Sequence, residues 1–113
     1  MRQVSSVKLL TDVTATGPGA AHLMWGAYHT FQATGTTSAG AGAATVVVQV
    51  SDVTSPGTGD TSGDWITLGT ITLTLSTTSS SDGLASTAAW RWVRGRVTAI
   101  SGTDGTVQLF MGA

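Results

Sequence analysis

The residues best suited to chemistry lie in one short stretch near the C-terminal end of the chain. Residues 90–96 read Trp-Arg-Trp-Val-Arg-Gly-Arg, and they contain three of the five basic residues of the protein. In an extended strand, alternate side chains face the same side. One face would therefore be both aromatic and cationic, formed by Trp90, Trp92, Arg94 and Arg96. Trp and Arg are enriched where protein interfaces concentrate their binding energy, so this pattern favours a docking face for another protein.

The same stretch has two other interpretations. Trp90 can instead fill the end of the core, with the arginines solvated at the surface. A face that combines aromatic and basic groups is also typical of platforms for single-stranded nucleic acid. The chain has six Asp against five basic residues and a net charge of -1, which argues against general binding to nucleic acid or to an anionic membrane. Phe110 is a further candidate for contact with a protein partner.

Patterns for catalysis and metal binding are weak. A nucleophilic Ser needs a neighbouring base, and only His22 and His29 offer one. A hydrolase would need one of them beside Ser and Asp in a single cleft, and the chain has no Gly-x-Ser-x-Gly motif. Asp52, Asp60 and Asp64 bracket one segment and have the oxygen ligands that Ca²⁺ accepts, but their spacing matches no established calcium loop. We expect no catalytic residues, no cofactor and no metal site, with the aspartates forming turns.

The composition indicates that strands position these residues. The 113 residues include 21 Thr, 12 Ser, 15 Gly and 14 Ala, with no Glu and no Cys. Thr is β-branched and suits a pleated strand, whereas the usual surface helix formers are scarce. Alternation predicts strands over residues 4–10, 21–33, 44–52, 65–76, 88–100 and 106–111. In the second of these, one face would carry Trp25, Ala27, His29, Phe31 and Ala33.

The remaining segments are expected to be turns and loops. Residues 17–19 are expected to interrupt the hydrogen-bond ladder between strands. Residues 34–44, 53–64 and 77–86 are predicted to be polar or Gly-rich loops. Residues 101–105 read as a hairpin turn. Within 65–76 the apolar positions change from even to odd at Gly69, which predicts a bulge or bend there. In the strand after residue 44, Val46, Val48 and Val50 should point inward.

We therefore expect one domain over residues 1–113. The fold class predicted is all-β, a jelly-roll-like two-sheet sandwich of seven or eight short antiparallel strands. The long segments after Ala33 and Asp52 suit crossings between two sheets. No apolar run approaches the length of a membrane span, and the start of the chain lacks the apolar stretch of a signal peptide.

Part of the chain resembles a known class of proteins. The segments that carry the resemblance are TVVVQVS (45–51), WITLG (65–69), WVRGRVTAISGT (92–103) and VQLFMG (107–112). They resemble segments of small virion proteins of tailed bacteriophages, and 92–103 is the most specific piece. The resemblance implies a non-enzymatic capsid decoration or cement protein, assembled in the bacterial host cytoplasm and bound as a dimer or trimer outside the shell of the major capsid protein.

A second function remains open. Tail and fibre proteins of phages share the same composition rich in Thr, Gly and Ala, and some of them bind carbohydrate or a receptor. Exposed Trp rings with Asp and Gln partners suit sugar binding, and Trp25, Trp65, Trp90 and Trp92 offer such rings.

Overall fold

The computed structural model describes residues 6–24, 28–87 and 89–112. These residues form strands and connecting segments, with no helix among them. The strands are β1 (Ser6–Val13), β2 (Gly17–Pro18), β3 (His22–Leu23), β4 (His29–Thr36), β5 (Ala39–Ser51), β6 (Ile66–Leu75), β7 (Ser80–Ser86), β8 (Trp92–Thr103) and β9 (Thr106–Gly112). The all-β prediction is confirmed.

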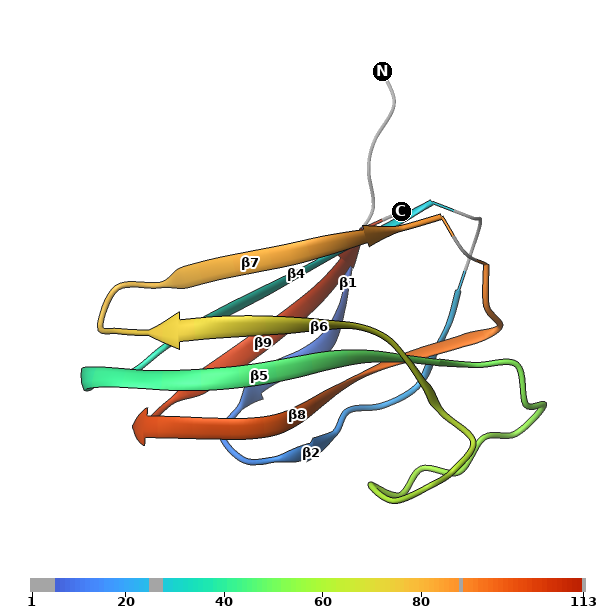
Figure 1. Cartoon of the computed structure of the whole chain (residues 1–113), viewed down its shortest axis with the longest axis horizontal. Helices are drawn as coiled ribbons and strands as arrows, with labels where there is room; N and C mark the ends of the chain where they lie inside the picture. Colours follow the sequence, from blue (N-terminus) through green and yellow to red (C-terminus); the bar gives the residue numbers. More distant parts are fainter. Residues whose placement is uncertain (1–5, 25–27, 88, 113) are drawn as a thin grey trace.

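The strands form two antiparallel sheets that pack together as a β-sandwich (Figure 1). Sheet A has the order β1-β9-β4-β7, and sheet B has the order β2-β8-β5-β6, with β3 also paired to β8. The two short strands β2 and β3 follow each other along β8 and act as one interrupted strand. Counted so, the part of the chain that the structure describes has eight strands, and the first pairs with the eighth, the second with the seventh, the third with the sixth and the fourth with the fifth. This nested pairing is that of a double-sheet jelly roll.

The core lies between the sheets, where strand alternation directs the apolar side chains. Val46, Val48 and Val50 of β5 are fully buried, as their spacing predicts. From β4, the buried side chains include Phe31 and Ala33, which share a face with His29. Trp25 and Ala27, which we placed on the same face, lie outside the described residues.

The predicted bulge at Gly69 is confirmed. Gly69 pairs with Val48, whereas Gln49 pairs with Thr67, so Leu68 is the extra residue in β6. A Cβ at Gly69 would lie 2.5 Å from Leu84 Cδ2, so any larger residue there would have to displace the Leu84 side chain of β7. Before the bulge, the even-numbered apolar positions should point inward by the same alternation. Ile66 is one of them but is 54% exposed, because it is the first residue of an edge strand.

Two segments expected to be loops are strands instead. Residues 34–44 contain the end of β4 and the start of β5, joined by a tight turn in which Thr37 Oγ1 donates to Gly40 O (2.6 Å). Residues 80–86 form β7, which pairs with β4 along its whole length. Small residues are needed in both places: a Cβ at Gly35 would meet Leu75 Cδ2 at 2.7 Å, and one at Gly83 would meet Phe31 O at 2.5 Å.

Other boundaries also differ from expectation. The turn at residues 101–105 is not a hairpin, because β8 and β9 belong to different sheets and the chain crosses between them.

Gly17 and Pro18 do not interrupt the hydrogen-bond ladder. They pair with β8 at the sheet edge, where Pro is tolerated. The strand expected over 21–33 is divided into β3 and β4, which belong to different sheets. The first strand runs to Val13, three residues beyond the prediction.

Candidate functional site

The aromatic and cationic face of β8 lies on the outer side of sheet B. There Trp92 pairs with Ser51, Arg94 with Gln49, and Arg96 with Val47. These β5 residues point away from the core, as expected, but all three are buried. The cover is residues 52–65, which connect β5 to β6 and which we call the strap. The predicted long loop is confirmed, but the expected crossing between sheets is wrong, because β5 and β6 pair with each other in sheet B. The loop instead folds back over the face that we expected to be open.

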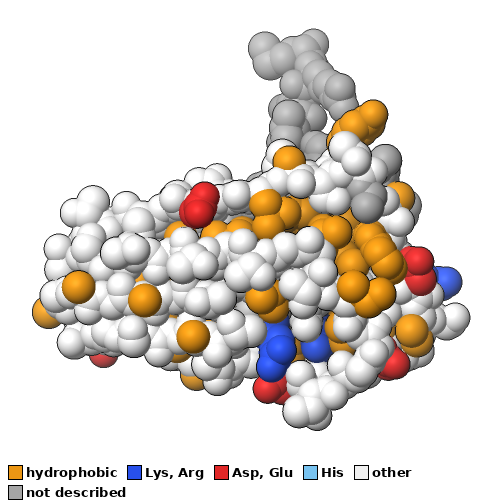
Figure 2. Space-filling model, in the orientation of Figure 1, with side chains coloured by type: hydrophobic (Ala, Val, Ile, Leu, Met, Phe, Trp, Pro, Cys, Tyr) orange, Lys and Arg blue, Asp and Glu red, His pale blue; other side chains and the backbone are white. Residues whose placement is uncertain are grey.

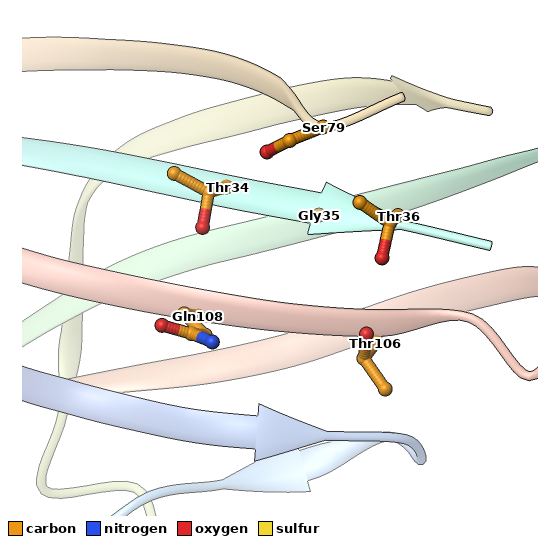
Figure 3. A pocket seen from close by; sticks show the side chains of 6 residues that line it. All are labelled: Thr34, Gly35, Thr36, Ser79, Thr106 and Gln108. Carbon is orange, nitrogen blue, oxygen red and sulfur yellow. The ribbon is translucent and has the colours of Figure 1, made fainter. Parts of the chain in front are cut away.

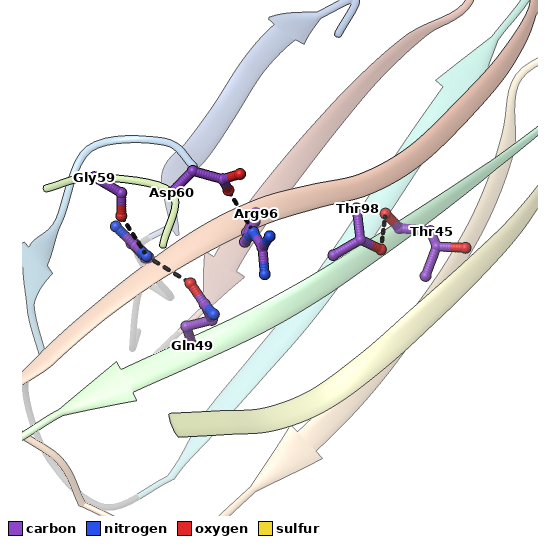
Figure 4. Close-up of polar contacts among 7 residues, drawn as sticks. Thr45, Gln49, Gly59, Asp60, Arg96 and Thr98 are labelled. Carbon is purple, nitrogen blue, oxygen red and sulfur yellow. Dashed lines mark hydrogen bonds and ion pairs between the residues drawn. The ribbon is translucent and has the colours of Figure 1, made fainter. Parts of the chain in front are cut away.

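Arg94 is the centre of the site and is only 1% exposed. Its Nε donates to Gln49 Oε1 (2.8 Å) and its Nη2 donates to Gly59 O (3.3 Å). The two acceptors, Gln49 and Gly59, are labelled in Figure 4. Its guanidinium carbon lies 4.4 Å from the centroid of the Trp65 ring, within cation–π distance. Burial lowers the pKa of Arg94 below its ordinary value, and the charge of Arg96 lowers it further, while Asp60 acts in the opposite direction.

Polar contacts hold the strap in place. The Arg96 Nε lies 2.6 Å from Asp60 Oδ1 in a partly exposed ion pair. Trp65 Nε1 donates to Gly57 O (2.8 Å), and Gly57 N donates to Asp64 Oδ2 (2.8 Å). The strap is therefore an ordered cover with its own hydrogen bonds.

The aspartates of the strap do not meet at one point. Asp52 Oδ1 accepts from Arg91 N (2.9 Å), Asp60 pairs with Arg96, and Asp64 accepts from Gly57 N. Within the described residues, no group of three or more His or Asp side chains is placed to hold a metal ion. His22 and His29 lie in different sheets, on β3 and β4.

The five residues expected to contact a partner do not form one surface. Arg94 was expected to be exposed; this is wrong, because the strap covers it. Trp90 is half-buried and packs against the core, and Trp92 is half-buried with its Nε1 out of contact with solvent. Arg96 is partly exposed. Phe110 lies on the opposite side of the sandwich, on the outer face of sheet A, with Lys8 Nζ 5.5 Å from its ring centroid.

Sequence reasoning did not connect Arg94 to the residues that surround it. Gln49 and Gly59 were missed, and Asp60 and Trp65 were considered only for calcium and sugar binding. All four come from β5 and the strap, between 29 and 45 positions before Arg94. No local pattern connects them to β8. The sequence held one usable signal: the segment 52–65 contains a Trp and several Asp, and these residue types can contact the arginines of residues 90–96.

Sheet A has hollows of its own. One of about 90 Å³ is lined by polar and small residues of β4, β9 and the segment before β7, among them Thr34, Ser79 and Gln108 (Figure 3). Another, of about 290 Å³ and mainly apolar, is bordered by Tyr28, Ala85 and Gly112, and Tyr28 is 77% exposed. Neither had a signal in the sequence.

No family model matches this chain, and neither a curated protein nor a solved structure matches it. Among the described residues there is no helix long and apolar enough to cross a membrane.

Proposed function

We propose that this protein is a capsid decoration, or cement, protein of a tailed bacteriophage. In this role it binds the outside of the major capsid protein shell and stabilises the head without catalysing a reaction. The observation that carries the proposal is the nested jelly-roll pairing, because double-sheet jelly rolls are common in viral capsid domains. A fold alone does not specify a function. The proposal therefore rests on this fold together with the resemblance of residues 45–112 to phage virion proteins.

The two outer faces offer different contacts for such a role. Phe110 and Lys8 lie on the outer face of sheet A, and Arg96 lies beside the strap on sheet B. A protein with contacts on opposite faces can bind the shell with one and a second copy of itself with the other, which fits a dimer or trimer at the virion surface. Many copies then stabilise a shell collectively, even where each contact is weak.

Copy number in the virion tests the proposal. Intact particles are banded from the source lysate on a density gradient, and the ratio of this chain to the most abundant coat protein is measured by quantitative mass spectrometry. A decoration protein should be present within a few-fold of the coat protein. A handful of copies per particle would place the chain in the tail, and its complete absence would refute a virion role.

A rebinding assay then tests the contact. Particles stripped of the protein are incubated with wild-type protein or with Phe110→Ala, and the bound fraction is measured by sedimentation. We expect Phe110→Ala to weaken binding. Thr106→Ala, a change on the same outward-facing side of β9, serves as the matched control.

One observation favours a second function, a carbohydrate-binding component of the tail or fibre. The ring of Tyr28 is exposed beside an apolar hollow, and such rings pack against the apolar faces of sugars. Of the Trp residues expected to serve this purpose, Trp25 lies outside the described residues. The other three are less suited than Tyr28, since Trp65 is buried and Trp90 and Trp92 are half-buried. A glycan array probed with wild-type protein and with Tyr28→Ala tests this function: binding that Tyr28→Ala abolishes would support it.

A further inference from the structure

Arg94 is a buried cation that forms no ion pair of its own with the described residues. The ion pair found among the described residues joins Arg96 to Asp60, and the groups that accept hydrogen bonds from Arg94 are neutral, namely the Gln49 amide and the Gly59 carbonyl. Moving a charge out of water is costly unless an opposite charge or a full set of hydrogen bonds compensates it. The compensation around Arg94 is partial.

Two hydrogen-bond donors on this face also lack an acceptor among the described residues. Arg94 Nη1 and Trp92 Nε1 are both buried, and no hydrogen-bond partner for either lies in residues 6–24, 28–87 or 89–112. The two residues are separated by one position on β8, so their side chains leave the same face of the strand next to each other. Buried donors are nearly always satisfied in folded proteins, and each exception calls for an explanation.

We propose that Arg94 and Trp92 form a binding site for a carboxylate group, which the strap covers while the site is empty. A carboxylate has two acceptor oxygens for the guanidinium and indole N–H groups, and its single negative charge matches the single uncompensated charge of Arg94. Arg96 is already paired with Asp60, so a doubly charged phosphate would bring more charge than the site needs. The carboxylate belongs to a small acid or to an acidic side chain of another protein.

Only the part of the strap before Trp65 has to move for a ligand to reach Arg94. The contact of this part with Arg94 is the long 3.3 Å hydrogen bond from Nη2 to Gly59 O, whereas the Trp65 ring at the end of the strap stays against the guanidinium. The Arg96–Asp60 pair is partly exposed. Exposed ion pairs contribute little because solvent screens them. Most strap residues from Thr54 to Asp64 are exposed. Figure 2 shows basic side chains reaching the surface beside an acidic one on this face.

Acetate is the probe for the site. The ¹⁵N-labelled protein is titrated with sodium acetate, and the control titration uses sodium chloride at equal pH and ionic strength. The signals followed are the Trp92 indole N–H, assigned with Trp92→Phe, and the Arg94 Nε–H. We expect both to shift saturably with acetate and not with chloride, while the Trp90 indole stays unchanged. The absence of an acetate-specific shift up to molar concentration would overturn the proposal.

Variants connect the shift to the site. Arg94→Gln should abolish it, whereas Arg91→Gln, a change at a nearby exposed Arg, should leave it unchanged. Asp60→Asn releases the strap and should tighten binding about 1.5- to 5-fold. If Arg94→Gln does not fold, Trp92→Phe should weaken binding several-fold as read from Arg94 Nε–H. Undiminished binding in the variants of Arg94 and Trp92 would refute the site.

The source of the carboxylate is distinguished in the same assay. A capped peptide with a central Asp is titrated beside acetate. Tighter binding of the peptide would indicate an acidic side chain of a partner protein, and equal binding would indicate a small acid. Both results support the carboxylate site. The assay uses the isolated chain, so its outcome is independent of whether the protein is found in virions.

Discussion

Trp65 offers the sharpest test of how the strap is held. It is 9% exposed and makes two separable contacts: its Nε1 donates to Gly57 O (2.8 Å), and its ring lies under the guanidinium of Arg94, 4.4 Å from the centroid. Trp65→Phe removes the hydrogen bond and keeps a ring beside Arg94. Trp65→Ala removes both, together with the burial of the ring.

The two substitutions should differ clearly in the free energy of unfolding. A lost hydrogen bond of this kind costs about 0.5–1.5 kcal/mol, so Trp65→Phe should destabilise the protein by that amount. Truncation of a buried Trp costs about 3–5 kcal/mol, a figure to which the lost cation–π contact contributes. At about 4 °C per kcal/mol for a domain near this size, the expected losses in Tm are about 2–6 °C and about 12–20 °C.

Urea unfolding followed by circular dichroism measures these changes, and amide hydrogen exchange locates them. Both variants should speed exchange in residues 57–64, and Ile66→Ala, at the exposed neighbouring position, should change stability by less than about 0.5 kcal/mol. Equal losses in the free energy of unfolding for Trp65→Phe and Trp65→Ala would show that the packing of the ring against Arg94 does not stabilise the protein. Unchanged exchange of the strap in Trp65→Phe would refute the hydrogen bond to Gly57.

Three further predictions concern the sheets and the ion pair. Gly69→Ala should cost about 1–3 kcal/mol in urea unfolding because its Cβ would strike Leu84, and Leu84→Ala in the same chain should recover part of the loss; strictly additive costs would contradict this contact. Arg96→Gln should cost no more than about 1 kcal/mol at low salt and less at high salt, and a loss that salt does not reduce would argue against an exposed pair. Leu109→Ala should lower the free energy of unfolding by about 2–5 kcal/mol, and Gln108→Ala, on the outward side of the same strand, should serve as its near-neutral control.

The sequence was informative wherever apolar residues alternate. The period of two identified the buried side of β5 through Val46, Val48 and Val50, and it located the bulge at Gly69 from the change of parity in β6. Both features follow from the pleat, which is local in the chain. The all-β class and the sandwich could be predicted for the same reason.

Tertiary structure alone decided the strands built from small residues and the environment of Arg94. The segments around Gly35 and Gly83 carry no periodic pattern of large apolar residues. Neighbouring parts of the fold approach these two positions so closely that only small residues fit there. The spacing of residues 90–96 correctly placed Arg94 on the outer face of the sheet. It could not show that the strap, which begins 42 positions earlier, folds over that face and buries the charge. Alternation determines which way a side chain points, and only the packing of distant segments determines whether water reaches it.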